Sequence, residues 1–338
     1  MFEKLKQHLS SRYRDAFVFH LNVEISAQCN LNCRICGFQR YYKPKGLMGM
    51  ETFKRLEDAF KKADSVLFGF NAETLLNKQV IEMLAFAKKA NPKLRASILT
   101  NGSLLTPELS EQLIVNGLDD LSISIDGATK KTHESIRKGS DFDKLISSIR
   151  TLNELKENYK SNTPFLSTNY VGTKDNINEL LAFIDLAKEL KFGSVRLTNI
   201  EPYTDEMQSK ILYGDSYDES ISETIDKAKK KCEELGIQFS YPEFKKDDAV
   251  KCEFMQPIIT WQGDVIPCSQ FTYERDTLYY GKRVFHPVIS FGNINDKSFE
   301  DIWNSKAYRK FRKDVAKGKG PDFCYRSCLL REKVLCPK

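Results

Sequence analysis

Three cysteines, Cys29, Cys33 and Cys36, lie within eight residues near the amino-terminal end of this 338-residue chain. Thiolates are soft ligands that suit zinc or an iron–sulfur cluster. A structural zinc site normally takes four protein ligands, and none of the four histidines stands at zinc-finger spacing from these cysteines. Three thiolates would leave one iron of a 4Fe–4S cluster open to a substrate or cofactor. We therefore expect a cluster here, with structural zinc and a distant fourth ligand as the alternative.

A second group of cysteines lies near the carboxyl-terminal end of the chain. Its members are Cys252, Cys268, Cys324, Cys328 and Cys336. Disulfide frameworks are typical of small secreted chains, and this chain is neither small nor preceded by a signal peptide. The group therefore predicts metal ligation, with a single zinc ion as the alternative to an iron–sulfur cluster.

The remaining cysteine, Cys232, belongs to neither group. It falls at three- and four-residue steps on one stripe of an expected helix with Ile221, Ile225, Ala228 and Leu235. A buried cysteine behaves as a small hydrophobic residue. The pattern therefore favours a structural role for this side chain.

The elements that must position these residues alternate between strands and helices. Short apolar segments predict six strands, at residues 17–26, 65–70, 95–100, 120–125, 164–170 and 194–200. Thr106 followed by Pro107 predicts a helix start, and Gly117, Gly193 and Gly236 predict helix stops. This alternation predicts a parallel α/β sheet, doubly wound or barrel-like. Such sheets carry their chemistry at the carboxyl ends of the strands. The first cysteine group follows the first strand, so it is predicted to lie at this edge.

The bulk properties are those of an ordinary globular protein, with 41% hydrophobic and 29% charged residues. The sequence shows no membrane-spanning segment and predicts a cytoplasmic protein. A net charge of +6 is mild and does not favour a nucleic-acid partner. We expect an N-terminal extension at 1–16, an α/β core at 17–244, and a small metal-stabilised domain at 245–338.

Around the first cysteines, the chain resembles the radical SAM superfamily, whose signature is a Cys-x3-Cys-x2-Cys loop after the first strand. The segments GFNAETLLN, LTNGSLL and SISIDG…THESIRKG resemble the motifs of that family after the next three strands. Asn71, Ala72 and Thr74 depart from the Gly, Gly and Pro that are usual there. The resemblance implies a partial (β/α)6 TIM barrel, S-adenosylmethionine (SAM), and a 4Fe–4S cluster bound by the three cysteines.

The same resemblance implies roles for four further residues. Glu73 would bind the amino group of SAM, and Leu197 would line the adenine. Ser124 and Arg137 would hold the carboxylate or ribose, since arginine suits a bidentate contact to a carboxylate. The alternatives are a solvated loop acid for Glu73, a turn residue for Ser124, and a surface ion pair for Arg137.

The C-terminal residues resemble the SPASM or shorter twitch extension of these enzymes. The resemblance rests on CEFMQPIITWQGDVIPC, FGNIND, FEDIWNS and CYRSCLLREKVLC. It implies a small cysteine-rich domain with one auxiliary 4Fe–4S cluster, for which four of the five cysteines of the second group suffice.

The resemblance also implies an activity. Reductive cleavage of SAM would give a 5′-deoxyadenosyl radical that abstracts hydrogen from a substrate C–H bond. We expect dehydrogenation, cross-linking or epimerisation of a peptide or protein, with a flavodoxin- or ferredoxin-type electron donor. A sugar or aminoglycoside-type small molecule is the alternative substrate, and RNA modification or a non-enzymatic metal scaffold are further alternatives. In an epimerase, Cys232 would return the hydrogen atom, which is the alternative to its structural role.

Overall fold

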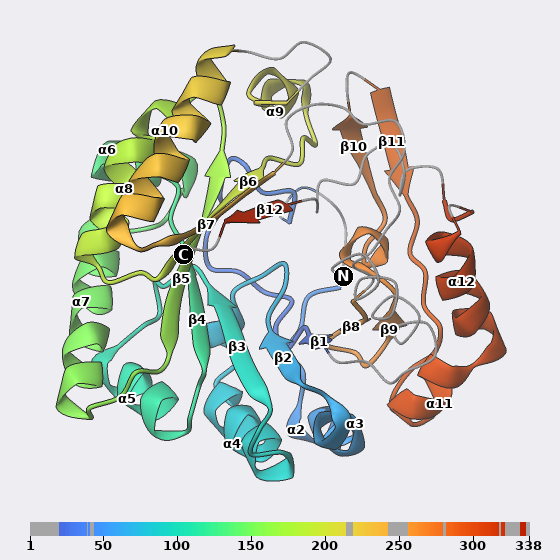
Figure 1. The fold of residues 1–338 in the computed structure, drawn as a ribbon. Coiled ribbons are helices and arrows are strands. Elements are labelled where there is room, and N and C mark those ends of the chain that lie inside the picture. Colours follow the sequence, from blue (N-terminus) through green and yellow to red (C-terminus); the bar gives the residue numbers. More distant parts are fainter. Residues whose placement is uncertain are drawn as a thin grey trace, which may run out of the picture.

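The computed structural model describes residues 20–38, 40, 44–213, 219–242, 256–279, 282–317, 319–321 and 332–335. Its centre is a curved ten-stranded sheet in the order β12-β7-β6-β5-β4-β3-β2-β1-β8-β9, and β10 pairs with β11 in a separate two-stranded sheet (Figure 1). The sheet is parallel from β8 through β1 to β7. The mixed α/β architecture with a largely parallel sheet confirms the predicted fold class.

The strands of the barrel are β1 His20–Val23, β2 Ser65–Phe68, β3 Arg95–Thr100, β4 Asp120–Ser124, β5 Phe165–Gly172, β6 Ser194–Asn199 and β7 Gln238–Pro242. The C-terminal strands are β8 Ile258–Ile259, β9 Val265–Ile266, β10 Arg275–Tyr279, β11 Lys282–His286 and β12 Glu332–Leu335. The helices are α2 Met50–Lys54, α3 Glu57–Lys62, α4 Val80–Ala90, α5 Pro107–Val115, α6 Lys130–Ile136, α7 Phe142–Asn158, α8 Leu180–Glu189, α9 Asp205–Ser209, α10 Glu219–Leu235, α11 Phe299–Asn304 and α12 Lys306–Ala316, with short 3-10 turns η1 Thr74–Leu76, η2 Ile177–Glu179 and η3 Ser269–Phe271.

The structure confirms all six predicted strands and adds a seventh, β7, which the sequence analysis missed. The helix boundaries predicted at Thr106, Gly117 and Gly236 also hold. By contrast, α8 ends at Glu189, and Lys191, not Gly193, takes the left-handed conformation beyond it. Thr106 caps α5 by accepting a hydrogen bond from the amide of Leu109, and Pro107 is the first residue of that helix. Gly236 follows α10 with φ +68°, a left-handed conformation that glycine adopts readily.

One face of the sheet is apolar and is covered by helices (Figure 1). Tyr170 of β5 packs against Phe183 of α8 with ring centroids 4.7 Å apart, and Phe68 of β2 packs against Phe53 of α2 at 5.7 Å. Leu197 of β6 lies beside Tyr170 in the strand register, so it belongs to the same face. These residues form the main hydrophobic core, which ties the helices to the barrel.

The opposite, inner face of the barrel strands is largely polar. Because side chains alternate along a strand, the residues between the buried ones point to this face. Asn169 stands in register with Ser124 on one neighbouring strand and with Arg196 on the other. Further polar members of this face are Asn22, Ser97 and Ser122. Asn169 donates a hydrogen bond to Ser122 at 2.9 Å. The barrel thus presents hydrogen-bonding groups on its inner side and hydrocarbon on its outer side.

The C-terminal region is joined to both edges of the barrel sheet rather than set apart from it. β8 extends the sheet beside β1, and β12 pairs antiparallel with β7 at the opposite edge. The predicted boundary near residue 245 falls outside the described residues. The strands on its C-terminal side nevertheless share one hydrogen-bonded sheet with the core.

None of the described helices is both long enough and apolar enough to cross a membrane.

Candidate active site

The cysteine loop, residues 27–38, follows β1 and lies at the carboxyl-terminal edge of the barrel. Backbone hydrogen bonds attach it to the end of α6, from the amide of Arg34 to the carbonyl of Ile136 at 2.8 Å, and to the segment just after that helix, from Asn32 to Lys138 at 3.0 Å. Its first residue, Ala27, donates to the carbonyl of Gly46 at 2.8 Å. The loop is therefore held from several sides before any cofactor binds.

The three thiols of this loop are in electrostatic contact. Burial raises the pKa of Cys33 to about 12, the charge of Arg137 opposes this change, and the charges of Cys36 and Cys29 add to it. Burial also raises the pKa of Cys29. Within the described part of the chain, no three His, Cys, Asp or Glu side chains lie close enough together to hold a single metal ion. Three thiols in one loop suit a cluster, whose irons bind thiolates at separate corners.

Glu73 lies fully buried at the edge of the barrel beside the cysteine loop. Its amide donates to the carbonyl of Gln28 at 2.9 Å. Its Oε1 accepts from the amide of Leu75 at 3.0 Å and from Thr100 Oγ1 at 2.6 Å, and its Oε2 accepts from the amide of Asn101 at 2.6 Å. Burial raises the pKa of Glu73, and these hydrogen bonds oppose the change. The carboxylate keeps acceptor capacity for an ammonium group.

Arg137 is placed by a buried ion pair. Its Nε lies 2.7 Å from Oδ2 of Asp126, whose side chain has no exposed surface, while the arginine side chain is 11% exposed. Burial opposes the charge of the guanidinium, but the charges of Asp126 and Cys33 raise its pKa, so it stays protonated. The arginine therefore carries its positive charge next to the thiols. This placement excludes the surface ion pair that was the alternative for this residue.

The other predicted site residues are distributed differently. Ser124 ends β4 on the polar inner face. Leu197 is fully buried in the core, on the helix-covered face, and so points away from the inner face. Cys232 is 1% exposed and lies on α10, which packs against α8 outside the sheet. Neither Leu197 nor Cys232 joins the group around the cysteine loop.

Three further residues at this edge were not predicted from the sequence. Asn101 places Nδ2 3.9 Å from Cys29 Sγ and 3.0 Å from Oδ1 of Asn30. Asp126 orients Arg137, and Thr100 binds Glu73. All three fall in the quoted segments LTNGSLL and SISIDG, where each follows or ends a predicted strand. Their position at strand ends was a signal that could have identified them.

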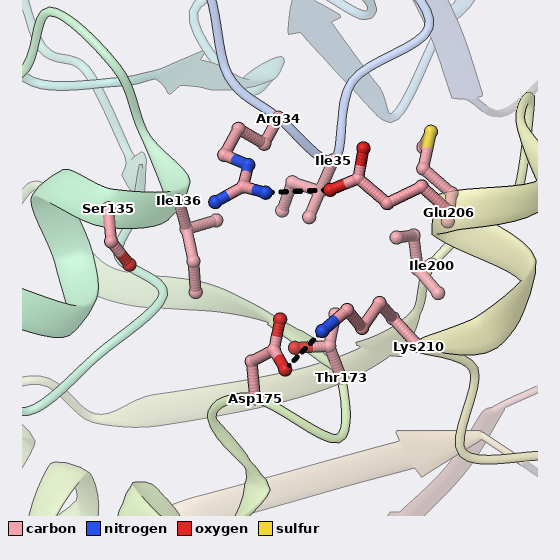
Figure 2. Close-up of a pocket in the computed structure, with 10 residues that line it drawn as sticks. Arg34, Ile35, Ser135, Ile136, Thr173, Asp175, Ile200, Glu206 and Lys210 are labelled. Atoms are coloured by element: carbon pink, nitrogen blue, oxygen red, sulfur yellow. Dashed lines mark hydrogen bonds and ion pairs between the residues drawn. The ribbon is translucent and has the colours of Figure 1, made fainter.

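A pocket opens beside the cysteine loop (Figure 2). Ile35, Ile136 and Ile200 are among the residues that line it. Two ion pairs border it, Arg34 with Glu206 at 2.6 Å and Lys210 with Asp175 at 2.7 Å (Figure 2). Ile200 directly follows β6, the strand that carries Leu197.

Of the second cysteine group, the structure describes Cys268, which is half-buried and directly precedes η3. Cys252, Cys324, Cys328 and Cys336 lie outside the described residues. Cys268 packs against a small apolar cluster that includes Ile258, Ile266 and Phe271.

Side chains of the C-terminal region reach the barrel edge directly. Tyr273 donates its hydroxyl between the two carboxylate oxygens of the buried Glu24, at 2.6 and 2.7 Å. Arg275 lies 3.3 Å from Glu201, which follows β6. The region that carries Cys268 is thereby fixed relative to the cysteine loop.

Two aromatic rings cover glycines at and just beyond the cysteine loop. A side-chain carbon added at Gly37 would overlap the ring of Tyr203, and one added at Gly46 would overlap the ring of Trp261. Trp261 belongs to the C-terminal region, in the turn between β8 and β9. Close packing of these rings requires glycine at both positions.

Two family models match the chain. Residues 23–187 match the radical SAM superfamily, and residues 251–329 match the SPASM iron–sulfur cluster-binding domain. The chain belongs to the radical SAM superfamily. Its first matched segment contains the cysteine loop, Glu73 and Arg137, and the second contains Cys268. As a radical SAM enzyme with a SPASM domain, it uses SAM and 4Fe–4S clusters.

Curated relatives within the superfamily have diverse activities. The chain is 29% identical to the tungsten-containing aldehyde ferredoxin oxidoreductase cofactor-modifying protein of Pyrococcus furiosus, over 87% of this chain and 83% of that protein. It is 27% identical to the AdoMet-dependent heme synthase of Methanosarcina barkeri, over 86% of this chain and 83% of the relative. It is also 26% identical to a GTP 3′,8-cyclase of Clostridium botulinum, over 77% and 84%.

Solved structures share the fold at lower identity. Streptococcus suis SuiB bound to S-adenosylmethionine superimposes with a TM-score of 0.65 at 17% identity, over 92% of this chain and 72% of SuiB. The structure of anSMEcpe with AdoMet and the Cp18Cys peptide gives a TM-score of 0.61 at 19% identity, over 91% and 88%. These similarities confirm the partial TIM barrel that the sequence predicted.

Proposed function

We propose that this radical SAM enzyme cleaves SAM at a 4Fe–4S cluster bound by Cys29, Cys33 and Cys36. The observation that carries the proposal is the convergence of groups from separate strand ends. Asn101 reaches Cys29 at 3.9 Å, Glu73 is tied to Gln28, and the charge of Arg137 acts on Cys33. When bound, the cluster and SAM supply the 5′-deoxyadenosyl radical that abstracts hydrogen from the substrate.

Each side chain at this edge has a distinct part in binding SAM. Glu73 accepts hydrogen bonds from the ammonium group of the methionine moiety, and Arg137 binds its carboxylate. Asp126 is a positioning residue, because it orients Arg137 from a fully buried site. Ile35 and Ile200 pack against adenine in the pocket of Figure 2, in place of Leu197. Ser124 binds the ribose or carboxylate from the inner face.

We further propose that the substrate is a peptide or protein side chain. Among the described residues, the inner face offers amide and hydroxyl groups, such as Ser122, Ser124 and Asn169, that match peptide amides. Its described cations are Arg196 and Arg95, and Asp120 neutralises Arg95 at 3.0 Å. A highly anionic substrate would require more positive charge than this. SuiB with its precursor peptide and anSMEcpe with a peptide, which share the fold, support this choice.

A small polar molecule is the second candidate. The curated relatives favour it, because their names describe a cofactor-modifying protein, a heme synthase and a GTP cyclase. The neutral inner face agrees with a sugar-like molecule better than with a nucleoside triphosphate. Dehydrogenation, cross-linking and epimerisation all begin with the same hydrogen abstraction.

One experiment separates these candidates. Under anaerobic conditions, the reconstituted enzyme is incubated with SAM and dithionite in deuterated water. Candidate peptides encoded by neighbouring genes are added in turn, followed by candidate sugars that the enzymes encoded by those genes would make. A substrate raises the yield of 5′-deoxyadenosine, and its own mass falls by two daltons on oxidation or gains carbon-bound deuterium on epimerisation. A peptide that reacts while sugars do not supports the first candidate, and the reverse result refutes it.

Glu73 offers a test of SAM binding itself. Its three neighbours all donate hydrogen bonds, so Glu73→Gln points a donor amide group at other donors. We expect cluster iron to be retained and SAM affinity to fall by more than tenfold. Unchanged SAM binding in equilibrium dialysis would contradict the proposed role of Glu73.

The auxiliary cluster is assigned to the second cysteine group. We propose that Cys268 is one ligand and that three of Cys252, Cys324, Cys328 and Cys336 supply the others. The half-buried thiol of Cys268 beside an apolar cluster suits a sulfur ligand shielded from water.

A further inference from the structure

Tyr308 is a fully buried residue of α12 in the C-terminal region. Its ring stacks on Phe291 with a centroid distance of 4.2 Å and an interplanar angle of 6°. It meets Trp303 edge-on at 5.0 Å, and the guanidinium of Arg312 lies 4.7 Å from its centroid. Phenylalanine could make each of these contacts. The packing alone therefore gives no reason for the hydroxyl group.

The hydroxyl of Tyr308 has no hydrogen-bond partner among the residues that the structure describes. Buried tyrosine hydroxyls elsewhere in the molecule are paired. Tyr170 donates to the carbonyl of Asn176 at 2.6 Å, and Tyr273 donates to Glu24. Burial of an unpaired hydroxyl is unfavourable, because the group gives up its hydrogen bonds to water. The exception at Tyr308 indicates that a partner of another kind completes this site.

Cys268 lies on the same side of the C-terminal region. Its thiol packs against the apolar cluster of Phe271, and Phe271 meets Phe311 of α12 edge-on at 5.7 Å. Phe311 in turn lies 5.3 Å from Phe291, the residue on which Tyr308 stacks. Burial raises the pKa of Tyr308, and the charge of Arg312 opposes this change. Tyr308 and Phe311 are three residues apart on α12 and so lie on the same side of that helix, and Phe311 packs against the same apolar cluster as Cys268.

We propose that Tyr308 donates a hydrogen bond to a sulfur of the auxiliary 4Fe–4S cluster at Cys268. The inference rests on the proposed assignment of Cys268 as a ligand. The residues present fit the group, because the thiol packs against an apolar cluster and the aromatic rings beside that cluster lead to a buried, unpaired donor on α12. A hydrogen bond to a cluster sulfur stabilises the more negatively charged, reduced cluster and raises its reduction potential. Tyr308 is a positioning residue that tunes the cluster, not a residue that reacts.

The test uses the full chain with Cys29, Cys33 and Cys36 replaced by alanine, so that iron binds to the auxiliary site alone. Tyr308→Phe is introduced into this background, and the cluster is titrated with dithionite while its EPR signal is recorded. We expect unchanged iron content and a midpoint potential shifted to more negative values. Tyr170→Phe, which removes a buried hydroxyl on the far side of the barrel sheet, is the matched control and should leave the potential unchanged.

Two further measurements separate tuning from a general structural effect. Tyr308→Phe should leave the melting temperature of the iron-free protein unchanged or higher, because it removes an unpaired hydroxyl, and should lower that of the reconstituted protein. ENDOR spectroscopy should find a proton coupled to the reduced cluster that disappears in deuterated water and in Tyr308→Phe. An unchanged potential together with an unchanged ENDOR spectrum would overturn the proposal.

The ligand assignment is tested separately by Cys268→Ala in the same background. Loss of the remaining iron supports the assignment. Full retention of the cluster would refute Cys268 as a ligand. It would also remove the basis on which the role of Tyr308 was inferred, whatever the Tyr308 variant does. Failure of the tuning role and failure of the ligand role are thereby distinguished.

Discussion

The two cysteine-bearing regions of the molecule are built in opposite ways. In the barrel, three thiols fall within one loop, and backbone hydrogen bonds to neighbouring strand ends hold that loop. In the C-terminal region, five cysteines are spread between residues 252 and 336, and only Cys268 lies among the described residues. The barrel can prepare its site from local geometry. The ligands proposed for the second site are distant from one another in sequence.

The regions also differ in what surrounds their sulfur atoms. Buried charges and strong hydrogen bonds surround the cysteine loop, notably Glu73 and the pair of Asp126 with Arg137. Cys268 instead packs against an apolar cluster that includes Ile266 and Phe271. In the proposed function, the first environment would position a charged cofactor such as SAM, whereas the second would shield a cluster from water. The difference indicates that substitutions at the two sites should fail in different ways.

Removal of ligands should show the largest difference between the regions. We expect about eight iron per reconstituted wild-type chain and about four after Cys29, Cys33 and Cys36 are changed to alanine. The same change should abolish 5′-deoxyadenosine formation, since no open iron remains. Cys268→Ala should lose the other half of the iron and still cleave SAM. Iron analysis and chromatography measure both, and SAM cleavage by the triple variant would contradict the assignment.

The buried ion pair should dominate the stability of the barrel edge. Asp126→Asn leaves the buried charge of Arg137 without a counter-charge, so we expect a loss of about 3–5 kcal/mol in the free energy of unfolding. Glu206→Gln is the control, because its pair with Arg34 is more than half exposed and should cost about 1 kcal/mol or less. Urea denaturation measures both. Equal losses would show that Asp126 does not stabilise the edge through its charge.

The ring over Gly37 should be the next most sensitive contact. Gly37→Ala forces a methyl group into the ring of Tyr203, and overpacking of this kind costs about 1–3 kcal/mol. Gly49→Ala is a control with open space around the added carbon. If the overlap is the cause, the double variant Gly37→Ala, Tyr203→Ala should show less than the sum of the two single losses. The free energies of unfolding are measured by urea denaturation. A loss in the double variant equal to the sum of the two single losses would refute the contact.

Each region holds one buried histidine that should make stability depend on pH. Burial lowers the pKa of His133 to about 3 and that of His286 to about 4, whereas an unfolded histidine titrates near 6.5. The unfolded chain therefore binds protons first as the pH falls. Each histidine should reduce stability below pH 6.5 by up to about 1.4 kcal/mol per pH unit, ending near pH 4 for His286 and near pH 3 for His133.

Replacement of either histidine tests this expectation. His133→Gln and His286→Gln should each flatten the dependence of the unfolding free energy on pH between 6.5 and 4.5. The amide of Asp126 donates to His133 Nδ1 at 3.3 Å, so the proton of the neutral ring lies on Nε2, toward Ser140. Identical pH profiles for wild type and variants would contradict neutral burial.

The smallest effect is expected at Cys232. Its thiol is buried on α10, and burial raises its pKa to about 12. Because the sheet separates it from the inner face, Cys232→Ala should leave product formation within twofold of wild type. The folded protein should also react slowly with iodoacetamide at this position. A variant that forms the radical but releases unquenched or altered product would restore Cys232 as hydrogen donor.

Much of the fold followed from local patterns in the sequence. Strand and helix boundaries such as Thr106 and Gly236 follow from capping chemistry that a few neighbouring residues determine. β7 was missed because its five residues do not alternate cleanly, with Phe239 and Ser240 both buried. The pairing of β8 with β1 and of β12 with β7 depends on contacts between segments far apart in the chain, which local periodicity does not encode.

The site divides in the same way. Cys29, Cys33, Cys36, Glu73 and Arg137 could be named because motif spacing identifies them. The role predicted for Leu197 stays a prediction; its side chain lies on the helix-covered face, and motif spacing alone does not specify the face on which a strand residue lies. Asp126 and Tyr308 could not be assigned roles, because the need of a buried group for a partner becomes visible only in three dimensions.

The closure of the barrel sheet by late strands has a consequence for protein synthesis. Strands β1 to β7 are synthesised before β8, β9 and β12, so a nascent chain whose last strands have not yet emerged from the ribosome exposes both edges of the sheet. Such edges attract other strands, and we expect chaperones to hold this intermediate. Completion of translation, not the barrel alone, ends its risk of aggregation.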